Sequence, residues 1–314
     1  MEKERFIEVV KGEVEKRAGV EIVTEQVRKN NGLTLTGMIF KEQGSNASVT
    51  IYVEDFYEAY QSGVEMEEII DVIYKEYMDN RITENIDLSD FREFAKAKIN
   101  IVCKLVNYEA NKDMLENIPH RRFMDLALSY YYIVQQTPYN GMAYIQITNN
   151  HMDFWGINEE ELLEVALINV QRLLPAKLDP IENVITRLTE KHVDLLDELS
   201  QKIVDRLMQK AKEYGTLEQE FPMYVLTNKG KTMGAVAIIY PEVLKEFADK
   251  VKSDLYILPS SIHETILLPA NTVLHPEELA PMVKDINSKV VNVVERLSDN
   301  VYIYHRKEDK IEML

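Results

Sequence analysis

The chain has 314 residues, of which 46% are hydrophobic and 28% are charged; this balance is typical of a globular protein and excludes a disordered one. Its 36 basic and 53 acidic residues give a formal net charge of −17, which disfavours direct nucleic-acid binding because phosphate backbones attract lysine and arginine. No apolar run approaches the roughly 20 residues that cross a bilayer, and no secretory signal is recognisable, so we expect a cytoplasmic protein without a membrane partner. The single cysteine, Cys103, excludes an internal disulfide.

Residues 1–82 predict a first domain made of a helix, a three-stranded antiparallel meander and two further helices. The meander is expected between residues 20 and 53, where Asn31-Gly32 separates two β-prone runs and signals a hairpin. The polar stretch 81–90 is the expected linker. The apolar residues of the first helix, at spacings of three and four, are Phe6, Val9, Val10 and Val14.

Residues 83–314 predict a larger domain in which strands and helices alternate. Its clearest helix, 158–174, has Asn158 as N-cap and Glu161 completing a capping box. Further helices are expected from Phe91 and over 181–213, 241–252 and 276–297. A short helix followed by a proline-containing turn is expected over 108–123. Strands are expected over 97–108, 124–136, 141–150, 223–228, 235–240, 254–260, 264–270 and 301–306, with a turn at 137–141 between the second and third.

Together these elements predict an α+β fold with mixed or antiparallel sheets and packed helices. The order strand, turn, strand, helix occurs twice, ending in the helices over 158–174 and 241–252. The match is one of pattern and not of letters. It indicates either a duplicated unit or the ordinary way in which sheets and helices pack.

The densest polar cluster is PSSIHE, residues 259–264, between two apolar runs. Ser261 and His263 lie on one face of an extended segment, so Ser261 is a candidate nucleophile, with His263 as its base and Glu264 beside them. The glycines of a nucleophile elbow are missing. The alternative is a bend, made by Pro259, Ser260 and Ser261, between two buried strands.

A second polar cluster, IPHRRF, places three basic residues together in an acidic chain. His120, Arg121 and Arg122 could bind a carboxylate or phosphate group, and Ser260 could contribute to such a binding site. They could equally anchor a turn through helix carbonyls or the protein's own acids. No metal site is expected, because His263-Glu264 lacks a second histidine four residues on.

Four separated stretches resemble one family. They are NYEANKDMLENIPHRRFMDLAL, FWGINEEELLEVAL, MYVLTNKGKTMGAVAIIYP and DLYILPSSIHETILLP. In these stretches the chain resembles an uncharacterised family of proteins from gut Firmicutes, classed as a domain of unknown function. The resemblance implies a cytoplasmic bacterial protein, often encoded near mobile elements, and implies no reaction.

The sequence contains no complete catalytic, nucleotide-binding or metal-binding signature. This favours a non-enzymatic binding or interaction protein that takes an unknown protein or small-molecule ligand and needs no cofactor. One alternative is a hydrolase-like enzyme that uses Ser261 with His263. The other is an acidic protein that imitates DNA and inhibits a DNA-binding partner, in keeping with a mobile-element setting.

Overall fold

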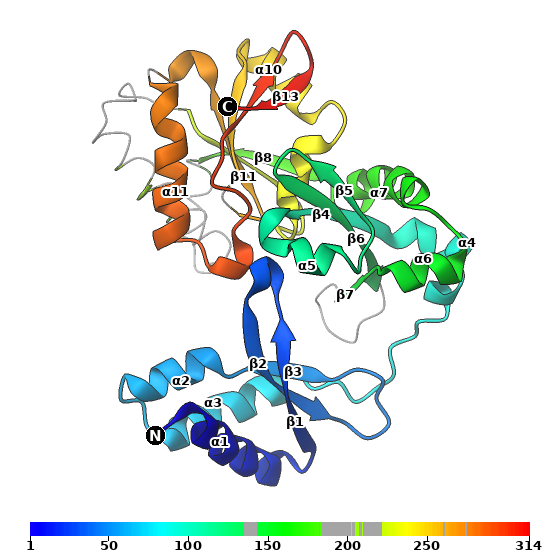
Figure 1. Cartoon of the computed structure of the whole chain (residues 1–314), viewed down its shortest axis with the longest axis vertical. Coiled ribbons are helices and arrows are strands. Elements are labelled where there is room, and N and C mark those ends of the chain that lie inside the picture. The colour runs from blue at the N-terminus through cyan, green and yellow to red at the C-terminus, as the bar shows by residue number, and fades with distance from the viewer. Residues whose placement is uncertain are drawn as a thin grey trace. The chain divides into compact units, whose positions relative to one another are not determined.

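The computed structural model describes residues 1–134, 143–181, 222–259, 261–273 and 275–314, together with 183, 202, 205, 206 and 209. The chain divides into two compact units (Figure 1). The first comprises Met1–Arg92 and Ile133–Tyr144, and the second comprises Glu93–Tyr132 and Ile145–Leu314. Helices and antiparallel strands in both units confirm the predicted α+β class. The assignment of 1–82 and 83–314 as domains stays a prediction.

The first unit contains the predicted antiparallel meander. Its strands are β1 (Glu21–Arg28), β2 (Thr34–Lys41) and β3 (Val49–Tyr52), paired in that order. Asn31 and Gly32, with φ of 59° and 72°, make the turn between β1 and β2, as the hairpin signal predicts. Both residue types tolerate this left-handed conformation, which explains why the turn forms here.

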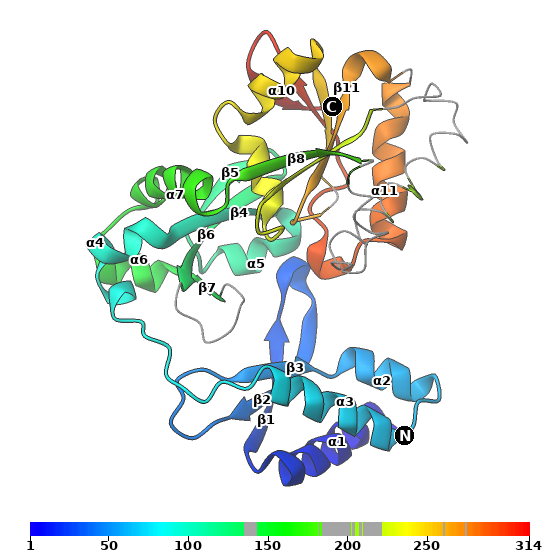
Figure 2. The same cartoon turned by 180° about the vertical axis from the view of Figure 1, so that it is seen from behind.

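Three helices cover this meander. They are α1 (Lys3–Ala18), α2 (Glu54–Gln61) and α3 (Met66–Asp79), and all three confirm the predicted helices. Helices α1 and α3 contact each other, and both views show them side by side (Figures 1 and 2). Their apolar faces meet the sheet in one core, which contains Phe6, Val10, Val14, Ile22, Met38, Phe40, Ile51, Ile73 and Tyr77.

The second unit contains two sheets, except for residues 133–134 and 143–144 of the smaller sheet, which belong to the first unit. The smaller one is built from β4 (Ile101–Asn107), β5 (His120–Phe123), β6 (Leu126–Val134) and β7 (Ala143–Gln146). Strand β6 pairs with β4 and β5 on its two sides and also with β7. All nine residues of β6 are buried, so its tyrosine run, Tyr130–Tyr132, is covered on both faces. Every side chain of this strand therefore contributes to packing, whichever face it lies on.

Helices pack on both faces of the smaller sheet. Helix α7 (Glu159–Leu173) contacts β4, and the Asn158 side chain and Glu161 form the predicted capping box at its start. On the opposite face, Leu115 of α5 (Lys112–Leu115) packs against Val106 and Ala127. The remaining helical segments are η2 (Asp90–Arg92), α4 (Phe94–Ala97), η3 (Lys98–Asn100), η4 (Glu109–Asn111) and α6 (Asn149–Trp155). Helix α6 was not predicted, because its polar start follows a β-prone run.

The larger sheet has six strands in the order β13-β12-β10-β11-β9-β8. Helix α11 (Leu279–Lys289) covers one face, and η5 (Gly234–Ile239) and α10 (Val243–Val251) lie on the other (Figure 2). Segment η5 also contacts β4, so it is packed between the two sheets. The strands are β8 (Ala176–Pro180), β9 (Tyr224–Asn228), β10 (Leu255–Leu258), β11 (Thr265–Pro269), β12 (Tyr302–His305) and β13 (Lys310–Met313).

In and around the larger sheet, two predicted elements differ from the structure and two strands were not predicted. The predicted strand 235–240 is wrong: η5 occupies it, because β9 is already paired on both sides, with β8 and β11. The helix predicted over 276–297 is shorter and is followed by the separate η8 (Val293–Glu295). Strands β8 and β13 were missed, because AKLDP and KIEM carry weak strand signals. The turn at 137–141 and most of the helix expected over 181–213 lie outside the described residues.

Candidate functional site

The segment 259–264 connects two antiparallel strands, β10 and β11, as the bend interpretation predicts. Ser261 is fully buried and forms an isolated β-bridge with Arg296. Its hydroxyl oxygen accepts a hydrogen bond of 3.1 Å from the backbone N–H of His263. The two residues are therefore in contact, but the contact joins a hydroxyl to an amide. Ser260 lies outside the described residues.

The His263 ring has its own partners. The backbone N–H of Met233 donates to Nδ1 at 3.3 Å, which places the ring hydrogen of the neutral imidazole on Nε2. Glu295 Oε1 lies 3.8 Å from Nε2, beyond hydrogen-bond distance. Burial, assisted by the charge of Lys104, lowers the pKa of His263 to about 4. Burial also raises the pKa of the Glu295 carboxyl, so the surroundings of this ring disfavour charge of either sign.

This geometry bears on the predicted Ser261–His263 pair. A general base must present an unshared nitrogen lone pair to the hydroxyl that it deprotonates. In His263 that lone pair is on Nδ1, where it accepts the Met233 hydrogen bond. Glu264, the third candidate, is buried directly before β11, with 5% of its surface exposed. The observed contacts of the turn are those of a folded connection, and its catalytic role stays a prediction.

Backbone hydrogen bonds hold this turn to its neighbours. Ile262 N–H donates to Glu295 O at 2.8 Å, and Ile262 O accepts from Ala235 N–H at 3.3 Å. Thr227 Oγ1 donates to His263 O at 2.8 Å. Gly234 passes so close that an added Cβ would lie 2.4 Å from His263 O and 2.2 Å from Thr227 Oγ1. Residues 261–264 are thus a packing centre of the second unit.

Asp125, which sequence reasoning missed, forms a second polar centre. Its carboxylate accepts hydrogen bonds from Ser298 Oγ at 2.6 Å, Asn300 Nδ2 at 2.9 Å and Tyr302 OH at 2.6 Å. Burial raises the pKa of Tyr302, with the Asp125 charge adding to the shift. The three donors are more than 170 positions away along the chain, so no local pattern could have identified this cluster.

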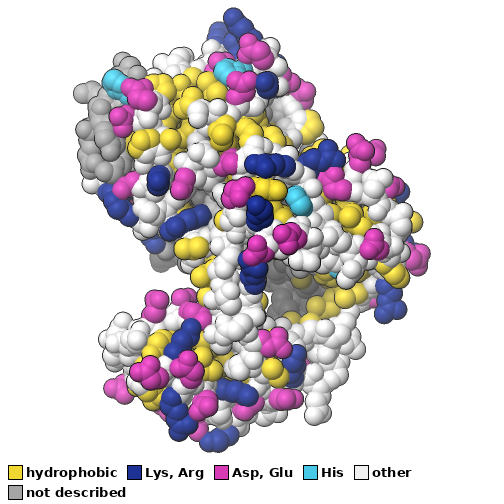
Figure 3. Space-filling view, viewed as in Figure 1, with side chains coloured by type: hydrophobic (Ala, Val, Ile, Leu, Met, Phe, Trp, Pro, Cys, Tyr) yellow, Lys and Arg dark blue, Asp and Glu magenta, His cyan; other side chains and the backbone are white. Residues whose placement is uncertain are grey.

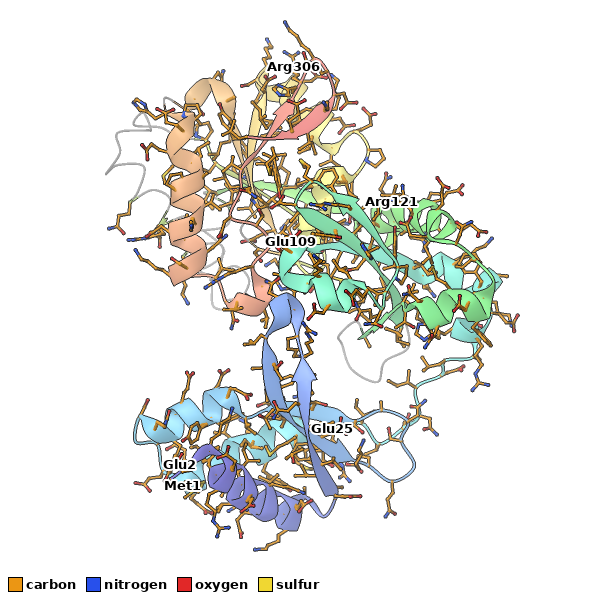
Figure 4. The ribbon with its side chains drawn as sticks, viewed as in Figure 1. Met1, Glu2, Glu25, Glu109, Arg121 and Arg306 are labelled. Atoms are coloured by element: carbon orange, nitrogen blue, oxygen red, sulfur yellow. The ribbon has the colours of Figure 1, made fainter. Side chains whose placement is uncertain are left out.

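The basic cluster His120-Arg121-Arg122 is a strand and not a turn, because it belongs to β5. Successive side chains of a strand point to opposite faces, so the three residues do not act together. Arg121 faces α7, where its Nε donates to Glu159 Oε2 at 3.0 Å; Figure 4 labels it at this side of the sheet. Tyr130 OH donates to the other oxygen of the same carboxylate. The Arg121 charge is therefore balanced by a carboxylate of the protein itself.

His120 and Arg122 lie on the opposite face of the smaller sheet. His120 Nδ1 is 3.1 Å from Ile118 O, and its ring lies 6.1 Å from that of Tyr108. The Arg122 guanidinium stacks over the Tyr108 ring at 4.3 Å and donates from Nε to Met124 O. Among the described residues, neither side chain forms an ion pair with a carboxylate.

A pocket of about 480 Å³ opens between η5–α10 and the β12–β13 hairpin. Tyr304 and Ile311, which are paired across the hairpin, line it, and Asp309 accepts a hydrogen bond from Tyr304 OH at 2.5 Å. Arg306, labelled in Figure 4, begins the turn of this hairpin. The full lining is Phe123, Ile238, Ile239, Tyr240, Pro241, Glu242, Leu244, Lys245, Tyr304, Asp309, Lys310 and Ile311.

Two negative observations apply to the described part of the chain. It contains no group of three histidine, cysteine or acidic side chains placed to hold a metal ion. None of its helices combines the length and apolarity needed to span a membrane.

Comparison with known proteins places the chain in one family. The model of a family described as "Family of unknown function (DUF5688)" matches residues 3–306, and the chain therefore belongs to this family. No curated protein and no solved structure matches it.

Proposed function

We propose that this member of the DUF5688 family is a cytoplasmic bacterial binding protein that acts without catalysing a reaction. The observation that carries this proposal is the pocket between η5–α10 and the β12–β13 hairpin. Its volume of about 480 Å³ falls in the range of ordinary ligand sites, roughly 300–1,000 Å³. Ligand sites are typically apolar with a few placed polar groups. Eight of the twelve residues that line this pocket are apolar or aromatic, and the other four are charged.

The lining indicates the class of ligand. Phe123, Ile239 and Ile311 are partly exposed apolar side chains that can contact it. Two acids and two lysines accompany them, Glu242, Asp309, Lys245 and Lys310, whose formal charges cancel. A neutral or zwitterionic ligand with an apolar body, including an apolar side chain presented by a partner protein, fits such a surface.

A ligand screen tests the proposal. Aromatic and aliphatic amino acids and short apolar peptides are added to the full chain, and binding is measured by ligand-observed NMR and by the shift in unfolding temperature. Hits should bind saturably to the wild type and at least tenfold more weakly to the variant Ile311→Ser.

The matched control is Met313→Ser. Met313 lies two residues further along β13, is 52% exposed and does not line the pocket. The Met313→Ser variant should bind the hits as the wild type does. Equal losses in both variants, or no saturable ligand at all, would refute the pocket as the binding site.

The hydrolase alternative has its own test. If Ser261 were a nucleophile activated by His263, a fluorophosphonate probe would label the folded chain and His263→Ala would abolish the labelling. The Met233 hydrogen bond to His263 Nδ1 supports the opposite outcome, an unlabelled folded chain. Reproducible turnover of any substrate, abolished by a single site substitution, would overturn the binding proposal.

The DNA-imitation alternative needs a continuous acidic stripe. On the face shown in Figure 3, acidic side chains alternate with lysines and arginines over both units. Many acids are also in ion pairs, such as Glu67 and Asp71 with Arg17. This mixed surface supports a ligand-binding protein over a DNA mimic.

A further inference from the structure

One face of the smaller sheet collects basic and hydroxyl side chains in a single row. In the antiparallel register, Lys104 of β4 is paired with Ser129 of β6, and Ser129 is paired with His120 of β5. Residues directly opposite each other project to the same face with Cβ atoms about 4.5–5.5 Å apart. Lys104, Ser129 and His120 therefore form one cross-strand row, with the hydroxyl between two basic groups.

The rest of this face carries no acidic side chain in its three central strands. The neighbouring row is Val106, Ala127 and Arg122, and the row on the other side pairs Val102 with Tyr131. In a chain with a net charge of −17, this strand face brings together Lys104, His120 and Arg122 without an acid. The helical segments η4 and α5, which follow β4, each contain one acidic residue, Glu109 and Asp113, and both side chains are exposed.

Two residues in the row have unusual surroundings. Ser129 is fully buried, and its hydroxyl oxygen has no hydrogen-bond partner. Lys104 is half-buried, and its ammonium lies over the Tyr131 ring at 4.8 Å; within the described residues it forms no ion pair. A buried hydroxyl without a partner is rare in a folded protein and calls for a reason. An anion held by Lys104 would accept a hydrogen bond from the Ser129 hydroxyl and balance the lysine charge.

We propose that Lys104, Ser129 and His120 form an anion-binding site on this face of the sheet, and that its ligand carries a phosphate group. The Lys104 ammonium pairs with the phosphate, the Ser129 hydroxyl donates to one phosphate oxygen, and the His120 ring borders the other side. A phosphate carries about −1.5 to −2 charges at neutral pH and so matches a row of two basic groups better than a carboxylate does. Ser129 is buried, so a ligand needs a path to its hydroxyl. The flexible Lys104 side chain opens this path by leaving the Tyr131 ring when the ligand binds.

The site is separate from the pocket of the preceding proposal, since the two share no residue. It differs also from the cationic cluster that the sequence suggests. Strand alternation removes Arg121 to the other face and brings in Lys104 and Ser129, which no sequence motif connects with His120.

The experiment uses the full chain with inorganic phosphate, at an ionic strength held constant with sodium chloride. Isothermal titration calorimetry and ³¹P NMR should show saturable binding in the wild type. Lys104→Gln should weaken it at least tenfold, and Lys104→Arg should restore most of it. Ser129→Ala should weaken it about threefold or more while leaving the folded chain intact, because only the donor to the ligand is lost.

Lys250→Gln is the matched control, since it removes one exposed positive charge from α10. It should bind phosphate like the wild type. Absence of saturable binding, or equal weakening by Lys104→Gln and Lys250→Gln, overturns the proposal. Methyl phosphate separates two sources of the ligand: tighter binding than phosphate supports an organic phosphate monoester, and weaker binding supports the free ion.

Discussion

The close approach of Gly234 to the β10–β11 turn gives a sharp prediction about what holds the second unit together. A methyl group at Gly234 would lie 2.2 Å from Thr227 Oγ1, 2.4 Å from His263 O and 2.8 Å from Asn228 N. Real Cβ atoms do not approach other heavy atoms this closely, and two of the three neighbours are backbone atoms that cannot rotate away. Gly234→Ala must therefore move η5 away from the turn.

The cost can be worked out from two contributions. Forcing an extra carbon into a packed interior typically costs about 1–3 kcal/mol. Displacing the turn also breaks the hydrogen bond from Thr227 to His263, which contributes about 1 kcal/mol. We therefore expect Gly234→Ala to lower the free energy of unfolding of the second unit by about 3 kcal/mol.

Urea unfolding followed by tryptophan fluorescence measures this change, because the only tryptophan, Trp155, lies in the second unit. With a urea m-value of about 2 kcal/mol/M, the midpoint should fall by about 1.5 M. Gly12→Ala is the control for an added methyl group, since nothing lies within 4 Å of its Cβ. Because Gly12 lies in the interior of α1, the Gly12→Ala variant should have a free energy of unfolding about 0.5–1 kcal/mol higher than the wild type, measured by circular dichroism. A Gly234→Ala midpoint within about 0.3 M of the wild type would refute the close packing of η5 on the turn.

Three further predictions concern buried polar groups of the second unit. Asp125→Ala should cost about 3 kcal/mol in the same urea assay, because it leaves the buried Tyr302 hydroxyl without its acceptor. Tyr302→Phe removes only that hydroxyl and leaves Asp125 with the donors Ser298 and Asn300, so it should cost about 1 kcal/mol. Equal costs would contradict this account. In the folded chain the pKa of His263 is about 4, below its ordinary value of 6.5. Between these two pH values the unfolded chain therefore binds a proton that the folded chain does not. The free energy of unfolding should fall as the pH is lowered through this window, by roughly 3 kcal/mol at most. His263→Gln should flatten this part of the stability–pH curve, and an unchanged slope would show that the ring is not buried as a neutral group. Burial raises the pKa of the Cys103 thiol to about 12, so a disulfide reagent such as DTNB should label it only after urea unfolds the second unit; fast labelling of the folded chain would contradict its burial.

Local signals determined much of the fold, because their physical cause lies within a few residues. Asn31 and Gly32 adopt the positive φ that ends β1, and the side chains at Asn158 and Glu161 satisfy free backbone groups at the start of α7. The helical spacing of Phe6, Val10 and Val14 likewise buries one face of α1 whatever lies opposite it.

Other features depended on neighbours far away in the chain. The apolar run 235–240 is compatible with a strand or a buried helical segment, and it became η5 because β8 and β11 already occupy both edges of β9. Strand β8, despite its lysine, aspartate and proline, forms at the edge of a sheet that accepts such residues.

The candidate sites show the same difference between features set by nearby residues and features set by distant ones. Spacing along the chain predicted that Ser261 and His263 are neighbours, and it offered a bend between two buried strands as one interpretation of PSSIHE, which agrees with the structure. The side-chain partners of these two residues, the pairing of Arg121 with Glu159 and the position of Lys104 opposite Ser129 all depend on how distant segments pack. The reason is physical: spacing limits contacts along the chain, but the partner of a buried charge or hydroxyl is set by sheet pairing and helix packing that join distant segments.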